Sequence, residues 1–145
     1  MAARTILLCG AVLWLLAGIV GIGVASLGRE WLLQILPPLA IGADALGGAV
    51  SAFAMALVFV GAAHVAALIG LRRNTGWGRS AAILLAGILA AGLLTLAVSA
   101  LTGAADQPAS APGLIAAALA TGALAAAYGF AAARLAAEVR TAGGA

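Results

Sequence analysis

Charged residues are scarce in this chain. Only 8% of its 145 residues are Asp, Glu, Lys or Arg, whereas 66% are hydrophobic. In an ordinary soluble domain roughly a quarter of the residues are charged, because its surface must be solvated by water. The shortage therefore excludes a soluble globular domain and predicts a protein that is solvated by lipid.

Cysteine is almost missing and lysine is absent. Cys9 is the only cysteine, so the chain can form neither an internal disulfide nor a Cys-based zinc site, and we expect a buried thiol in an apolar helix. All seven basic residues are Arg, which together with the abundance of Ala is typical of a GC-rich genome. These Arg residues flank apolar runs instead of forming a patch, so we expect no nucleic-acid partner.

Four apolar stretches are long enough to cross a bilayer, which takes about 20 helical residues. They lie at about 5–27, within 39–71, at about 80–103 and at about 112–133. The first stretch is too long for the apolar region of a signal peptide, which usually has about 7–15 residues, so we expect it to be retained. The sequence predicts an all-α integral membrane protein, a four-transmembrane-helix bundle in a single domain spanning 1–145.

The distribution of Arg predicts the orientation in the membrane. Six Arg residues fall before the first span, between the second and third, and after the fourth, whereas Arg29 alone falls on the other side. Positive residues are enriched in cytoplasmic loops, so both termini are expected in the cytoplasm. We expect a multi-pass protein of a bacterial inner membrane, with the lipid bilayer as its surroundings.

The segment between the first two spans is expected to be partly helical. In residues 29–36, apolar side chains including Trp31 fall on one face, which predicts a short interfacial helix in the first extracytoplasmic loop. The apolar run 39–71 that follows would be about 50 Å long as one helix, well beyond the bilayer. We expect a break or kink near Gly47–Gly48, with a continuous, protruding helix as the alternative.

Small residues recur at intervals within the spans, and such spacing lets helix backbones approach closely in lipid. The fourth span is mainly Ala and Gly and is therefore expected to be packed on most sides by other helices. The small residues in question are Gly18, Gly21 and Gly23 in the first span, Gly87 and Ala91 in the third, and Ala118, Gly122 and Ala126 in the fourth.

Two ionisable residues, Asp44 and His64, lie within the second apolar run and are functional candidates because charge is costly in a membrane. Asp44 is either a solvated or capping carboxylate near the outer surface or a proton or cation site at the mouth of a cavity. His64 is either a neutral packing residue or a single axial ligand to a haem or pigment. About 30 Å of helix separates the two, which excludes an acid–base pair.

A polar stripe on the third span suggests a pocket. Thr95, Ser99 and Thr102 share a helical face, and Thr121 on the fourth span is at a matching depth. Together with Asp44 they would line a polar pocket open to the outside. The alternative is that these hydroxyls bond to their own backbone or join adjacent helices.

His64 and Tyr128 lie at similar depths near the cytoplasmic ends of the second and fourth spans. Each needs a hydrogen-bond partner that lipid does not supply. If these helices are adjacent, we expect the Tyr128 hydroxyl to bond to a neutral His64 imidazole in the inner leaflet.

No catalytic motif, phosphate-binding loop or group of metal ligands is recognisable in the sequence, so we expect neither an enzyme nor a cofactor. The first functional hypothesis is a non-catalytic accessory or scaffold subunit that contacts other membrane-protein subunits, or copies of itself, through its helices. The second is a transporter or channel for a small solute or ion, formed by an oligomer. The third is a haem- or pigment-binding membrane subunit.

Overall fold

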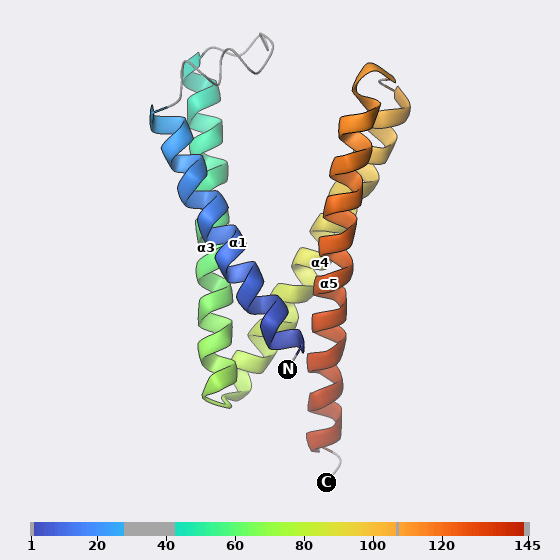
Figure 1. Cartoon of the computed structure of the whole chain (residues 1–145). Helices are drawn as coiled ribbons and strands as arrows, with labels where there is room; N and C mark the ends of the chain where they lie inside the picture. The colour runs from blue at the N-terminus through green and yellow to red at the C-terminus, as the bar shows by residue number, and fades with distance from the viewer. Residues whose placement is uncertain (1, 28–42, 107, 144–145) are drawn as a thin grey trace. The chain divides into compact units, whose positions relative to one another are not determined.

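The computed structural model describes residues 2–27, 43–106 and 108–143, and these residues are helical apart from the turn at 73–75 (Figure 1). The long helices are α1 (Ala2–Leu27), α3 (Ala43–Arg72), α4 (Gly76–Asp106) and α5 (Ala111–Gly143), and the short 3-10 helix η1 (Pro108–Ser110) precedes α5. All four long helices have a stretch long and apolar enough to cross a membrane. The prediction of an all-helical chain with four such helices is confirmed.

The helices are longer than the apolar stretches that predicted them. In α5 the helix continues about ten residues beyond the predicted span, through Arg134 and Glu138 to Gly143. Ala, Arg and Glu are good helix formers, so the backbone stays helical where the chain is no longer purely apolar. The ends of the apolar stretches therefore do not coincide with the ends of the helices.

Helix α3 is continuous through Gly47 and Gly48, so the predicted break is wrong, and a kink there stays a prediction. Among the described residues, no glycine has a positive φ. Two glycines weaken a helix by about 1 kcal/mol each, which is too little to interrupt a helix of this length. The predicted interfacial helix at 29–36 lies outside the described residues.

The described chain divides into two compact units, of which residues 8–66 form one. In this unit α1 and α3 pack antiparallel through glycine. A Cβ added to Gly18 would lie 2.6 Å from Val58 Cγ2, and one added to Gly61 would lie 2.6 Å from Leu15 Cγ. Gly21 similarly faces Ala54, so the predicted close approach is confirmed at Gly18 and Gly21.

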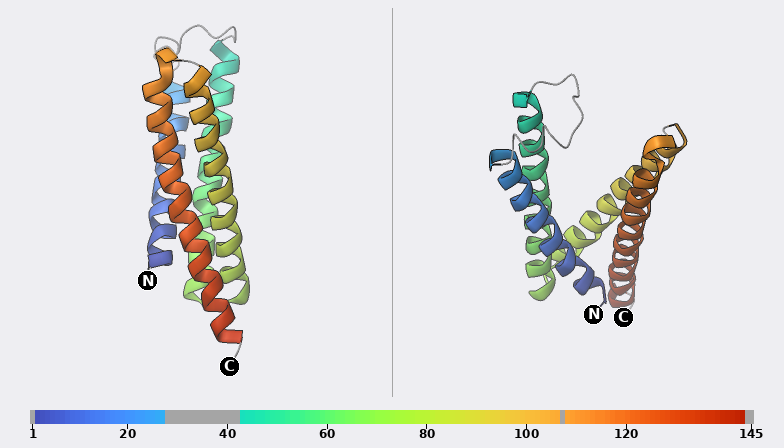
Figure 2. Two further views of the ribbon diagram at one scale, coloured as in Figure 1. Left: turned by 90° about the vertical axis from the view of Figure 1, so that its right-hand side faces the viewer. Right: turned by 45° about the horizontal axis from the view of Figure 1, so that its top comes forward.

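The second unit consists of residues 1–7 and 67–145 and contains α4 and α5. These two helices run antiparallel and lie side by side toward η1, whereas the start of α4 diverges from α5 (Figure 2). Helix α4 buries residues that are four or seven positions apart, as expected for one helical face; they are Gly78, Ala82, Ala86, Leu93 and Ala97. Between the helices, Pro108 starts η1 and Pro112 falls in the first turn of α5, where its missing N–H costs nothing.

A tight turn of three residues, 73–75, joins α3 to α4 within this unit. Asn74 adopts a left-handed conformation with φ of 50°, a common way to end a helix. The Thr75 hydroxyl and backbone N–H both donate to the Gly70 carbonyl, at 3.0 and 3.1 Å. A Cβ on Gly78 would collide with the Gly70 backbone. The turn therefore depends on two glycines whose backbones touch.

Other expectations about packing are corrected by the structure. Cys9 is exposed on α1, because it lies off the face that packs against α3. A Cβ on Gly122 would meet only Ala97 Cβ, at 4.0 Å, and Gly23 and Gly87 would meet nothing within 4 Å, so none of the three is a site of close backbone approach. Helix α5 buries no larger share of its span than the other helices, so it is not packed on most sides within this chain.

Candidate functional site

An apolar groove of about 360 Å³ runs between α4 and α5 in the second unit. It is lined by side chains that are small apart from one leucine. They are Ala90, Ala91 and Leu94 of α4 and Gly122, Ala125, Ala126 and Gly129 of α5. None of these side chains can be ionised or donate a hydrogen bond, so the groove can offer only van der Waals contact.

The groove exists because the two helices carry little side-chain volume where they meet. A Cβ on Gly122 would lie 4.0 Å from Ala97 Cβ, and one on Gly129 would lie 4.0 Å from Ala90 Cβ. Both separations are ordinary van der Waals contacts, so neither glycine is required by packing within the pair. Glycine at these positions instead keeps the groove open.

The hydroxyls predicted to line a polar pocket bond to their own helices. Thr95, Thr102 and Thr121 each donate to a carbonyl three or four residues earlier, at 2.8–3.0 Å. Ser99 is exposed on α4. Asp44 belongs to the first turn of α3, but its side chain lies outside the described residues, so the pocket stays a prediction.

His64 and Tyr128 are both buried, with exposed fractions of 0% and 2%. His64 Nδ1 lies 2.8 Å from the Val60 carbonyl oxygen, and since a carbonyl can only accept, Nδ1 must carry a proton and donate. A neutral imidazole then has Nε2 as its acceptor nitrogen. The two residues belong to different compact units, and their mutual hydrogen bond stays a prediction.

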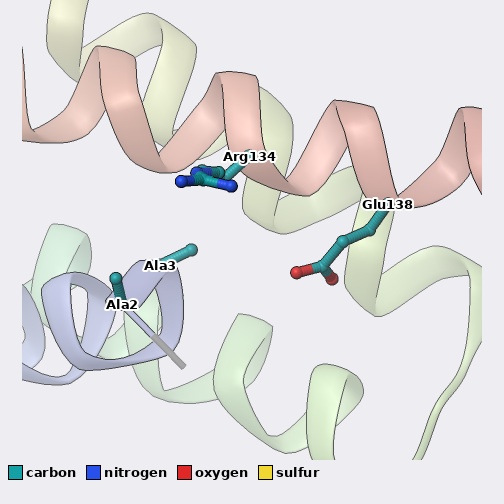
Figure 3. A pocket seen from close by; sticks show the side chains of 4 residues that line it. All are labelled: Ala2, Ala3, Arg134 and Glu138. Atoms are coloured by element: carbon teal, nitrogen blue, oxygen red, sulfur yellow. The ribbon is translucent and has the colours of Figure 1, made fainter.

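A second, polar cavity of about 250 Å³ lies at the other end of α5 from η1. It is lined by Ala2 and Ala3 of α1 and by Arg134 and Glu138 of α5. Figure 3 shows both charged side chains extending from α5 toward the space beside the first turn of α1. The Arg134 guanidinium carbon lies 5.2 Å from the centre of the Phe130 ring, within the range of a cation–π contact.

In the sequence, Arg134 contributes only to the predicted orientation in the membrane, and no prediction concerns Glu138. The spacing of four residues between them indicates that the two charges lie on one face of a helix, just beyond the last apolar span. No pattern in the sequence indicated that the start of α1 would close this space, because that requires a contact between distant parts of the chain.

In the part of the chain that the structure describes, no three His, Cys, Asp or Glu side chains gather where they could hold a metal ion. The chain was also compared with known proteins. Comparisons with family models, with curated proteins and with solved structures gave no match. Any functional interpretation therefore depends on the two cavities and the residues around them.

Proposed function

We propose that the protein is a non-catalytic accessory or scaffold subunit of a bacterial inner membrane, with both termini in the cytoplasm. The α4–α5 groove receives one transmembrane helix of a partner membrane protein. The observation that carries this proposal is the groove itself, an apolar hollow lined mainly by Ala and Gly. Small residues at a membrane interface let a second backbone approach closely, and van der Waals packing then drives association.

Two features favour helix packing over a solute pathway. The hydroxyls of Thr95 and Thr121 are already bonded to their own helices, which leaves them less able to coordinate a passing solute. The Ala-rich helix α5 is also no more buried than its neighbours, although Ala and Gly interact weakly with lipid chains. A partner helix in the groove would cover this surface with better packing than lipid can offer.

The groove can be tested with Gly122→Leu, matched by Gly92→Leu. The first substitution puts an isobutyl group into the groove, whereas Gly92 is exposed on α4 and a Cβ there meets nothing within 4 Å. In pull-downs from native membranes in mild detergent, Gly122→Leu should lose the partner that wild type and Gly92→Leu retain. Circular dichroism and gel filtration of both variants check that they are folded.

A crosslinking experiment avoids any effect of Gly122→Leu on folding. A photo-crosslinking amino acid at Ala126, which is exposed in the groove, should give one discrete adduct in cells, and the same residue at Gly92 should not. Adducts of equal yield at both positions, or none at either, would contradict the scaffold proposal.

The proposed orientation has a separate test. Single cysteines introduced at Arg73 and Ala137 should react with a membrane-impermeant maleimide only after the cytoplasmic membrane is opened, and one at Ala109 should react in intact spheroplasts. The native Cys9 should first be replaced by Ala. Labelling of Arg73→Cys in intact spheroplasts would show that the orientation is reversed.

A further inference from the structure

The cavity at the start of α1 offers a cation and an anion to one small ligand. Arg134 and Glu138 lie one turn apart on α5, about 6 Å along its axis, and both side chains line the same space (Figure 3). Ala2 and Ala3 form the opposite wall, and their small side chains leave a volume of about 250 Å³. This arrangement favours a ligand that carries both charges a few bonds apart.

Arg134 is arranged to bind a phosphate. Its guanidinium carbon lies 5.2 Å from the centre of the Phe130 ring, a cation–π contact. The guanidinium has five N–H donors in one plane, a geometry that suits two parallel hydrogen bonds to phosphate oxygens. Because Ala2 and Ala3 open helix α1, their backbone N–H groups have no acceptor within that helix and add to the positive potential of this wall.

Glu138 selects the second charge of the ligand. Its carboxylate accepts hydrogen bonds only, so it favours a primary ammonium, which has three N–H donors, over a quaternary ammonium, which has none. A phosphoethanolamine headgroup carries a phosphate and a primary ammonium joined by two carbons. A phosphocholine headgroup matches Arg134 equally well but cannot donate to Glu138.

We propose that this cavity binds the headgroup of a phosphoethanolamine lipid, with the phosphate on Arg134 and the ammonium on Glu138. The site rests on the proposed insertion in the membrane, since Arg134 is the first charged residue after the apolar stretch of α5 and so lies at headgroup depth. It is independent of the scaffold role, because no residue of the α4–α5 groove borders this cavity.

The test uses the full chain purified in detergent. Phosphoethanolamine, phosphocholine and phosphoglycerol lipids with identical acyl chains are added, and their binding is measured by native mass spectrometry and by thermal unfolding. Inorganic phosphate and free phosphoethanolamine are tested as ligands that carry the phosphate without a lipid tail. Wild type should bind the phosphoethanolamine lipid most tightly and show the largest rise in Tm with it. Arg134→Gln should weaken this binding about tenfold, the effect of losing a charged hydrogen bond.

Glu138→Gln should remove the preference for phosphoethanolamine over phosphocholine, while both lipids still bind. Arg140→Gln removes the same charge as Arg134→Gln from the last turn of α5 but does not line the cavity, and it should behave as wild type. Phe130→Leu keeps the apolar volume but removes the stacked ring, and it should weaken binding by less than Arg134→Gln does.

Equal affinities for the phosphoethanolamine and phosphocholine lipids in wild type would overturn the proposal, and so would equal losses in Arg134→Gln and Arg140→Gln. If inorganic phosphate raised the Tm as much as the phosphoethanolamine lipid does, the proposal would also be overturned, because the ligand of the cavity would then be a free anion and not a lipid headgroup. Binding of no lipid of any kind would also overturn the headgroup site, but it would leave the proposed membrane insertion standing, because that insertion depends on the four apolar helices and not on this cavity.

Discussion

The turn between α3 and α4 can be tested by replacing Gly78 with Ala. The added methyl group would collide with the backbone of Gly70, and its carbonyl oxygen would lie 2.8 Å away. A flexible side chain could rotate aside, but here the backbones of two helices have to separate. Overpacking of this kind typically costs about 1–3 kcal/mol, and the value should fall in the upper part of this range because the Thr75 hydrogen bonds to Gly70 are stretched at the same time.

Gly76→Ala is the matched control. It makes the same chemical change two residues earlier in the same helix, where a Cβ would meet nothing within 4 Å. Alanine is the better helix former by about 1 kcal/mol, so Gly76→Ala should be neutral or slightly stabilising, and the same gain partly offsets the clash at Gly78. The two variants should therefore differ by about 2–3 kcal/mol in the free energy of unfolding.

Reversible unfolding in mixed micelles, with SDS as denaturant and helicity measured by circular dichroism, gives this difference directly. Gly78→Ala should unfold at a lower SDS fraction than wild type, and Gly76→Ala at the same or a higher one. If the two variants unfold at the same SDS fraction, the Gly70–Gly78 contact is not the close approach that the structure shows.

Three further predictions can be measured in the same assay. Gly61→Ala should destabilise the protein by about 1–3 kcal/mol, since its Cβ would lie within 3 Å of Leu15. Gly48→Ala, at an exposed position of the same helix, should not destabilise it, and equal effects of the two substitutions would contradict the packing of α1 on α3. Thr75→Val keeps the shape but removes the hydroxyl that caps the Gly70 carbonyl, and should cost about 1 kcal/mol, with Thr75→Ser restoring most of it. His64→Ala should cost about 1–3 kcal/mol, because a fully buried ring leaves a void, and an unchanged midpoint would contradict the burial of the ring.

The number and nature of the helices could be predicted from the sequence because hydropathy and length are properties of local segments. Four runs of about 20 apolar residues have only one solution in lipid, in which each forms a helix that satisfies its own backbone. The break predicted at Gly47–Gly48 is wrong because two glycines weaken a long helix too little to interrupt it. Helix α5 continues past its apolar stretch toward Gly143 because Ala, Arg and Glu are good helix formers.

The contacts between helices were less accessible to sequence reasoning. Spacing of small residues within one helix does not reveal which of them meets a partner, and Gly18 and Gly122 look alike in the sequence although only Gly18 is tightly packed. Likewise, the spacing of Arg134 and Glu138 could have suggested a shared helical face. Only the fold could show that Ala2 and Ala3 complete a cavity with them.

The contact between Gly70 and Gly78 also limits how this chain can change during evolution. Any relative that keeps a three-residue turn here must keep glycine at both positions, because every other residue adds an atom where the two backbones already touch. Gly76 and Gly92, in contrast, are free to drift, and a family alignment should show them varying as ordinary surface positions do. Two glycines eight residues apart, with Asn and Thr between them, are thus the part of this sequence by which distant relatives should be easiest to recognise.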